Sequence, residues 1–94
     1  MTVIQIEHRV PDFDGWKKAF ESDPIDRKKS GVKSYRIYRP AGNKNYVVID
    51  LVFATVSEAE SALTALQKLW GKVEGTVMTG PQTRLLEIVE SKEY

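Results

Sequence analysis

Apolar and polar residues alternate along the first segment of the chain, residues 2–10, TVIQIEHRV. This period of two predicts a β-strand with one face turned toward a core. The residues that share the more apolar face are Ile4, Ile6, His8 and Val10. Those that share the other face are Val3, Gln5, Glu7 and Arg9. His8, which is the only histidine of the chain, is therefore expected to point toward the core.

The next segment, PDFDGWKKAFES, has its apolar residues three and four positions apart, which is typical of an amphipathic helix. These residues are Phe13, Trp16, Ala19 and Phe20. Asp12 is expected to cap the helix by accepting from its free amides. The helix should end near Pro24, because a proline disfavours helical conformation in the preceding residue. Residues 24–31 are expected to add a turn that stops at Gly31, with DRKKSG as a solvated surface turn.

Further strands are predicted at residues 32–39, 46–54 and 83–90, and a loop at residues 74–82, after Gly71. In the strand 46–54 one face is wholly apolar, with Val47, Ile49, Leu51 and Phe53. Its other face is mixed, with Tyr46, Val48, Asp50 and Val52. A second helix follows, with a capping pair of Thr55 with Glu58 or Ser57 with Glu60. Its expected buried face comprises Ala59, Ala62, Leu63, Leu66, Leu69 and Trp70.

This order of strand, helix, strand, strand, helix, strand predicts one α+β domain over residues 1–94 with a ferredoxin-like split β-α-β fold. We expect a four-stranded antiparallel sheet with both helices on one face, because right-handed crossovers place them on the same side. The uncovered face carries valines and a tyrosine among its polar residues, and a monomer usually hides such a patch. Packing of two sheets face to face in a homodimer is therefore expected.

Composition narrows the functional classes. The formal net charge is only +1, so the sequence gives no reason to expect nucleic acid or an anionic membrane as a partner. The chain has no cysteine, no apolar run long enough to span a bilayer, and no signal-peptide pattern at its start. These features favour a cytoplasmic protein. No metal-ligand cluster, dinucleotide fingerprint or nucleophile motif is present, and we expect no metal and no cofactor.

Two segments resemble the dimeric α/β-barrel superfamily: HRVPDFDGWKKAFESDP and DLVFATVSEAESALTAL. The chain is similar there to small proteins of the antibiotic-biosynthesis monooxygenase and cyclase type. The resemblance covers nearly the whole chain and implies an intersubunit barrel closed by two sheets. It also implies a pocket between helices and sheet in each subunit. The superfamily includes cofactor-independent monooxygenases, cyclases, haem-degrading enzymes and stress-responsive proteins, and a shared fold does not select among them.

His8 is the candidate catalytic residue. At the edge of an apolar cleft an imidazole can act as a general base near neutral pH. Two alternatives remain open: a local hydrogen bond that fixes the strand-to-helix corner, and ligation of a haem. Aromatic side chains are the candidate ligand-binding walls, although such a stripe is more often plain core. They are Trp16, Phe20, Phe13 and Trp70.

Asp50, Arg36 and Glu7 are expected to form a polar network on the open sheet face, inside the dimer barrel. Arg9 and Arg84 are further candidate partners. A pair of carboxylates for acid–base chemistry is the alternative role for Asp50 and Glu7. Whether Arg36 lies opposite Asp50 depends on the register of the intervening turn.

The leading functional hypothesis is a small homodimer that binds an aromatic or polyketide-like molecule between helices and sheet. If it is an enzyme, it is expected to be a cofactor-independent monooxygenase or cyclase. The alternative is a non-catalytic dimer of the stress-responsive type, in which His8 and Asp50 are structural. A binding protein should hold a cavity of about 300 Å³ or more beneath the helices.

Overall fold

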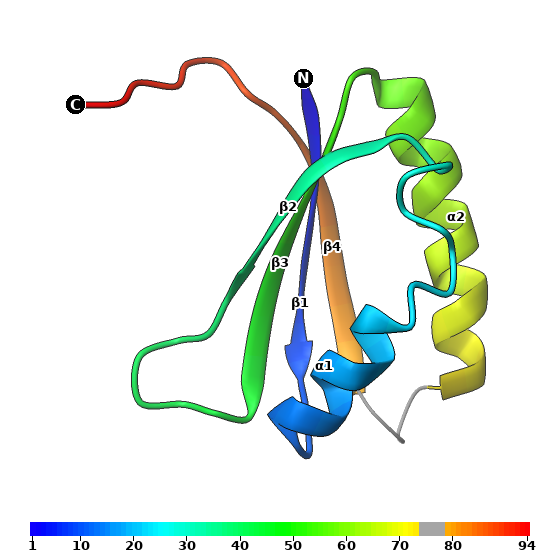
Figure 1. The fold of residues 1–94 in the computed structure, drawn as a ribbon, viewed down its shortest axis with the longest axis vertical. Coiled ribbons are helices and arrows are strands. Elements are labelled where there is room, and N and C mark those ends of the chain that lie inside the picture. Colours follow the sequence, from blue (N-terminus) through cyan, green and yellow to red (C-terminus); the bar gives the residue numbers. More distant parts are fainter. Residues whose placement is uncertain (74–78) are drawn as a thin grey trace.

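The computed structural model describes residues 1–73 and 79–94. Its elements follow in the order β1 (Thr2–Arg9), α1 (Phe13–Glu21), β2 (Val32–Tyr38), β3 (Tyr46–Phe53), α2 (Val56–Val73) and β4 (Thr79–Glu87). The four strands form one antiparallel sheet in the order β2-β3-β1-β4. Figure 1 shows both helices on the same side of this sheet. The ferredoxin-like βαββαβ fold predicted from the sequence is confirmed. No described helix is long and apolar enough to cross a membrane.

The two central strands build the covered face of the sheet. β1 and β3 pair without a register shift, so that Ile4 lies opposite Leu51 and Ile6 opposite Ile49. Opposite residues of an antiparallel pair point to the same face, and the two apolar sets therefore meet beneath the helices. All of these residues are buried, and His8 is buried with them, opposite Val47. The predicted core faces of both strands are confirmed.

Each helix begins at the expected cap. The Asp12 carboxylate accepts a hydrogen bond from the Gly15 amide at 3.0 Å, which satisfies one of the free donors at the start of α1. At the start of α2 the Thr55 hydroxyl accepts from the Glu58 amide at 3.2 Å. The buried residues that α2 presents to the sheet are Ala59, Ala62, Leu66 and Trp70.

The end of the chain differs from the prediction. β4 begins at Thr79 and ends at Glu87, whereas the sequence predicts a strand at residues 83–90 after a loop over residues 74–82. Residues 74–78 of that loop lie outside the described residues. Gly80 and Pro81 resemble a turn signal, but β4 is an edge strand, where a missing amide donor is tolerated. Gly71, which was predicted to precede the loop, lies within α2 instead.

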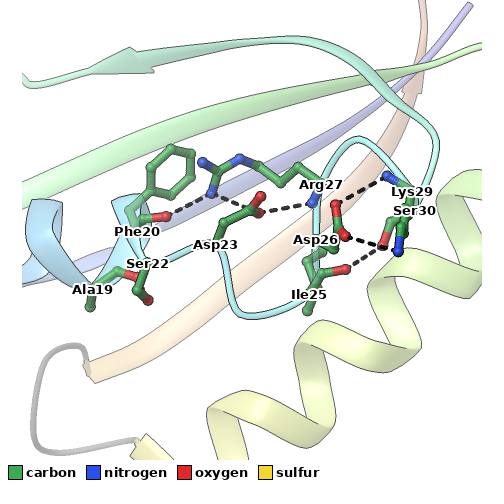
Figure 2. Close-up of polar contacts among 9 residues, drawn as sticks. All are labelled: Ala19, Phe20, Ser22, Asp23, Ile25, Asp26, Arg27, Lys29 and Ser30. Carbon is green, nitrogen blue, oxygen red and sulfur yellow. Dashed lines mark hydrogen bonds and ion pairs between the residues drawn. The ribbon is translucent and has the colours of Figure 1, made fainter.

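The connection from α1 to β2, residues 22–31, is a non-helical segment that we call the strap. Asp23 and Asp26 both have left-handed backbone conformations, with φ of 54° and 52°. Their carboxylates accept hydrogen bonds from backbone amides further along the strap, from Arg27 at 2.8 Å and from Lys29 at 3.4 Å (Figure 2). Short aspartate side chains with local hydrogen bonds tolerate this conformation better than most residues do. The strap reverses the chain before β2 without a further helix.

Candidate functional site

A cavity of about 200 Å³ lies between the helices and the covered face of the sheet. Its floor is formed by β1 and β3, and its walls by α1, the strap and α2. The side chains that line it on these elements include Ile6, His8, Ile49, Trp16, Phe20, Arg27, Leu66 and Trp70. Most of this lining is apolar, as in most small-molecule sites.

The volume bears on the class of ligand. It falls short of the roughly 300 Å³ expected of a binding protein. An apolar cavity of about 150 Å³ is nevertheless enough to bind benzene. The cavity described here therefore has room for a molecule of one or two rings, and larger polycyclic ligands require the walls to move.

His8 lies in the lining at the end of β1 and is only 2% exposed. Its Nδ1 atom lies 3.0 Å from the carbonyl oxygen of Arg9. A carbonyl oxygen can only accept, so this contact assigns the proton of the neutral ring to Nδ1. The lone pair then resides on Nε2, which is buried and has no hydrogen-bond partner in the described part of the chain. A buried polar atom without a partner is uncommon in a folded protein and calls for an explanation.

Burial lowers the pKa of the His8 imidazole below its ordinary value, and the hydrogen bond to the Arg9 carbonyl partly opposes this effect. The ring is therefore neutral near pH 7. A neutral Nε2 with a free lone pair accepts a hydrogen bond or a proton from a ligand hydroxyl. The same atom would be the one to bind the iron if a haem entered the cavity.

A row of aromatic contacts runs from His8 along α1. The His8 and Trp16 rings meet edge to face, with centroids 5.9 Å apart. Trp16 and Phe20 are stacked at 5.3 Å. Trp70 reaches the same cavity from α2. The Phe13 and Trp16 ring centroids are 5.8 Å apart, but Phe13 is not among the residues that line the cavity. Three of the four predicted aromatic walls therefore surround one space.

Arg27 belongs to the cavity and was not predicted there. The segment DRKKSG was expected to be a solvated turn, which fits the exposed Lys28 and Lys29 but is wrong for Arg27. The Arg27 side chain is only 17% exposed, and its guanidinium lies 4.0 Å from the centroid of the Phe20 ring. Its Nη1 donates to the Phe20 carbonyl at 2.7 Å (Figure 2). No spacing in the sequence indicates this placement, because it depends on the backbone turns at Asp23 and Asp26.

The polar residues of the open sheet face are arranged differently. Arg36 lies opposite Asp50 in the register of β2 and β3, which is the arrangement that the sequence left open. No ion pair joins their side chains in the described structure. The Asp50 carboxylate instead accepts from the Gln5 amide at 3.1 Å and from the Tyr38 hydroxyl at 2.9 Å.

Glu7 has its own partners on this open face. Its carboxylate accepts from the Tyr46 hydroxyl at 3.0 Å and lies 3.7 Å from Nη2 of Arg84. Desolvation, together with the hydrogen bond and negative charge of Glu7, raises the pKa of Tyr46. The tyrosine hydroxyls are partners that sequence reasoning missed, although Tyr46 and Asp50 share the predicted face by parity. Each carboxylate is thus hydrogen-bonded within its own sheet.

The described residues, 1–73 and 79–94, contain no group of three or more histidine, cysteine, aspartate or glutamate side chains that could hold a metal ion. His8 is thus part of no such group among the described residues. A single imidazole can hold a haem iron, but it makes a poor site for a free metal ion.

The sequence matches no protein-family model and no curated protein at a significant level. Solved structures match over nearly the whole chain. SnoaB from Streptomyces nogalater, a cofactor-independent oxygenase solved as a mutant, has a TM-score of 0.77 at 13% identity, over 96% of this chain and 94% of its own. MhuD from Mycobacterium tuberculosis, a heme-degrader with two hemes bound, has a TM-score of 0.70 at 18% identity, over 97% and 99%.

A dimeric ferredoxin-like protein from an uncultured marine organism gives a TM-score of 0.69 at 15% identity, over 97% of this chain and 96% of its own. The resemblance seen in the sequence thus extends to the three-dimensional structure. At these identities the likeness concerns the fold and does not carry an activity. The chain has the ferredoxin-like βαββαβ fold that these oxygenases and heme-degrading proteins share.

Proposed function

We propose that the chain binds a hydroxylated aromatic molecule of one or two rings in the cavity and oxidises it as a cofactor-independent monooxygenase. The observation that carries this proposal is the buried Nε2 atom of His8, which has a free lone pair and lines an otherwise apolar cavity. A buried acceptor without a protein partner is costly unless a ligand or water satisfies it. A ligand hydroxyl is the group that does so while its ring packs against Trp16 and Phe20.

The reaction is written for a naphthohydroquinone. His8 Nε2 removes a proton from one hydroxyl, and the electron-rich aryloxide then gives its electrons to molecular oxygen. One oxygen atom enters the ring as a hydroxyl group, the hydroquinone is oxidised to a quinone, and the second oxygen atom leaves as water. Hydroquinone and oxygen thus yield hydroxyquinone and water. The apolar walls keep solvent from the anion and from its reactive oxygen adduct.

Haem breakdown is the second candidate, because a neutral His8 Nε2 is also a suitable axial ligand and MhuD has the same fold. The cavity volume of about 200 Å³ argues against it. A porphyrin is far larger than the one or two rings that such a cavity admits, so haem would require the strap or the helices to move apart.

The proposal is tested by oxygen uptake with naphthohydroquinone, with isotopically labelled oxygen to show incorporation into the product. General-base catalysis contributes roughly 10²- to 10⁴-fold, so His8→Gln should lower kcat by at least about 100-fold. His8→Phe should do the same, and Tyr46→Phe on the open face serves as the matched control with unchanged kcat. Circular dichroism establishes that each variant is folded.

Tight binding of the hydroquinone without oxygen uptake above the protein-free rate would assign the chain to the non-catalytic alternative. Absence of both binding and turnover would leave His8 and Asp50 as structural residues only. Oxygen uptake that His8→Gln leaves unchanged would place the chemistry elsewhere and contradict the assignment of the base.

We also propose that the open sheet face is the surface of a homodimer. Val3, Val48 and Val52 lie on this face beside the carboxylate–tyrosine pairs, and the marine ferredoxin-like protein of the same fold is described as dimeric. Analytical ultracentrifugation should give twice the chain mass. Val48→Asp introduces an unpaired charge on this face and should yield monomers, whereas Lys28→Asp on the strap should not.

A further inference from the structure

Apart from the indole N–H groups of the two tryptophans, three residues bring polar side-chain groups to the cavity: His8, Ser22 and Arg27. The Ser22 hydroxyl donates to the Ala19 carbonyl at 2.6 Å, so its only O–H donor is used at the end of α1 and is not free for an anion (Figure 2). His8 offers a hydrogen-bond acceptor, and Arg27 offers a positive charge. The cavity thus has one neutral acceptor and one cationic donor, which lie at the two ends of the aromatic row of Trp16 and Phe20.

The donors of Arg27 are only partly used. Within the described residues, both polar contacts of its guanidinium involve Nη1. One is the hydrogen bond to the Phe20 carbonyl, and the other is a contact of 3.4 Å to a carboxylate oxygen of Asp23. Figure 2 shows that the second terminal nitrogen makes no drawn contact. A guanidinium has five N–H donors, so several remain for a ligand.

The position of Arg27 is fixed before any ligand arrives. Its guanidinium lies over the Phe20 ring at 4.0 Å and 5.2 Å from the Tyr35 ring. Its own backbone amide donates to Asp23 at 2.8 Å, which anchors the strap residue from which the side chain extends. A planar cation held against aromatic rings loses little conformational entropy when it binds an anion.

We propose that Arg27 recognises an anionic oxygen group of the ligand, so that the cavity selects hydroxylated aromatic acids. The carboxylate of such a molecule binds the free donors of Arg27, its ring packs against the edges of Trp16 and Phe20, and its hydroxyl reaches His8 Nε2. This inference rests on the proposed function for the identity of the cavity as the ligand site. It adds the chemical class of the ligand.

The electrostatics favour this class over a neutral one. The Asp23 side chain is 36% exposed and contacts a single nitrogen of Arg27 at 3.4 Å, which leaves the cation incompletely paired. A charge-assisted hydrogen bond is about twice as strong as a neutral one, and a carboxylate can bind a guanidinium through both oxygens. In a cavity with apolar walls, little solvent competes for these contacts.

The test compares two probes of nearly the same shape by isothermal titration calorimetry: para-hydroxybenzoate, which is anionic, and para-hydroxybenzyl alcohol, which is neutral. The wild-type protein should bind the acid at least about tenfold more tightly than the alcohol. Arg27→Gln should remove this preference, because it weakens binding of the acid more than binding of the alcohol. Arg27→Lys should restore part of it, because the charge returns without the planar fork.

Arg39→Gln is the matched control. Arg39 also lies over an aromatic ring of α1, at 4.6 Å from the centroid of Phe13, but it does not line the cavity. Its variant should keep the full preference for the acid. Circular dichroism distinguishes loss of preference from loss of the fold, and the wild-type comparison tests the inference even if Arg27→Gln does not fold.

The outcomes separate this inference from the proposed function. Equal affinity of the wild type for both probes, or a preference that survives Arg27→Gln, overturns the role of Arg27 but leaves the cavity as a binding site. A preference that depends on Arg27, together with an affinity for both probes that His8→Phe leaves unchanged, upholds this inference and contradicts the role of His8. Binding of neither probe overturns this inference, and oxygen uptake with naphthohydroquinone then decides the proposed function separately.

Discussion

The two faces of the sheet carry polar side chains in different ways. On the open face, Asp50 and Glu7 each receive a hydrogen bond from a tyrosine of the same sheet. On the covered face, His8 leaves Nε2 without a partner among the described residues, at the edge of a cavity. On both faces, polar side chains stand among apolar ones. The two carboxylates of the open face are hydrogen-bonded, whereas His8 on the covered face keeps one ring nitrogen without a partner among the described residues.

This difference indicates where a ligand belongs. A carboxylate that is already hydrogen-bonded within its own sheet gains little from a further partner. An unpaired acceptor in an apolar cavity gains a full interaction when a donor arrives. The open face and the candidate site therefore differ in whether their polar groups are fully hydrogen-bonded, and not in whether charged residues are present.

The largest expected contrast comes from neighbouring residues of β3 that point to opposite faces. Ile49→Ala should lower the free energy of unfolding by about 2–5 kcal/mol, because Ile49 is buried and the space it leaves collapses only partly. Val48→Ala should cost about 1 kcal/mol or less in dilute solution, because Val48 is only half-buried in a single chain. Urea denaturation followed by circular dichroism measures both. Equal costs at low protein concentration would contradict the assignment of the faces.

A second contrast concerns pH. Burial lowers the pKa of His8 in the folded chain below 6.5, so the unfolded chain binds the proton first as the pH falls. The stability that the neutral ring contributes is complete above about pH 6.5 and is lost as the pH falls toward the lowered folded-state pKa. The slope is at most about 1.4 kcal/mol per pH unit.

His8→Gln removes the titrating ring and should flatten this part of the curve of unfolding free energy against pH. The chain has no other histidine, so the difference between the two curves reports His8 alone. Tyr46→Phe on the open face should keep the wild-type slope between about pH 7 and pH 5, because neither tyrosine nor phenylalanine titrates there. A wild-type curve that stays flat in this range would mean that protonation of His8 does not destabilise the folded chain.

The smallest expected change in unfolding free energy comes from the tyrosine–carboxylate hydrogen bonds of the open face. Tyr38→Phe removes the hydroxyl that donates to Asp50 and should cost about 0.5–1.5 kcal/mol in unfolding free energy. Tyr35→Phe is the control: Tyr35 lies opposite Leu51, on the other face of β2, and its hydroxyl makes no hydrogen bond to the described residues, so the cost should be smaller. Both costs are read from urea denaturation curves. Tyr38→Phe should leave ligand affinity in the cavity unchanged, and a loss of affinity would show that the two faces are coupled.

The fold is predictable from the sequence because burial leaves a periodic signature. Alternation in residues 2–10 and 46–54 and the helical spacing of Trp16 and Phe20 correctly indicate which faces meet. Parity alone also places His8 among the buried residues. The register that pairs Arg36 with Asp50 follows from the turn between β2 and β3, and the sequence left it open.

Other features depend on conformations that residue types do not determine. The strap turns at two aspartates with positive φ, and this turn is what moves Arg27 from an apparent surface segment to the cavity wall. β4 includes Gly80 and Pro81 because it is an edge strand, a fact of topology that is invisible locally. The cavity volume likewise depends on how side chains pack, and at about 200 Å³ it falls below the roughly 300 Å³ set as the criterion for a binding protein.

The chain contains two tryptophans, and both Trp16 and Trp70 line the cavity. Every indole of the protein is therefore an optical probe of the same small space, without any label. The intrinsic emission will respond to a molecule that enters between the helices and the sheet. The proposed contact between two open faces would lie on the far side of the sheet and should leave that emission nearly unchanged, so one spectrum distinguishes ligand entry from self-association.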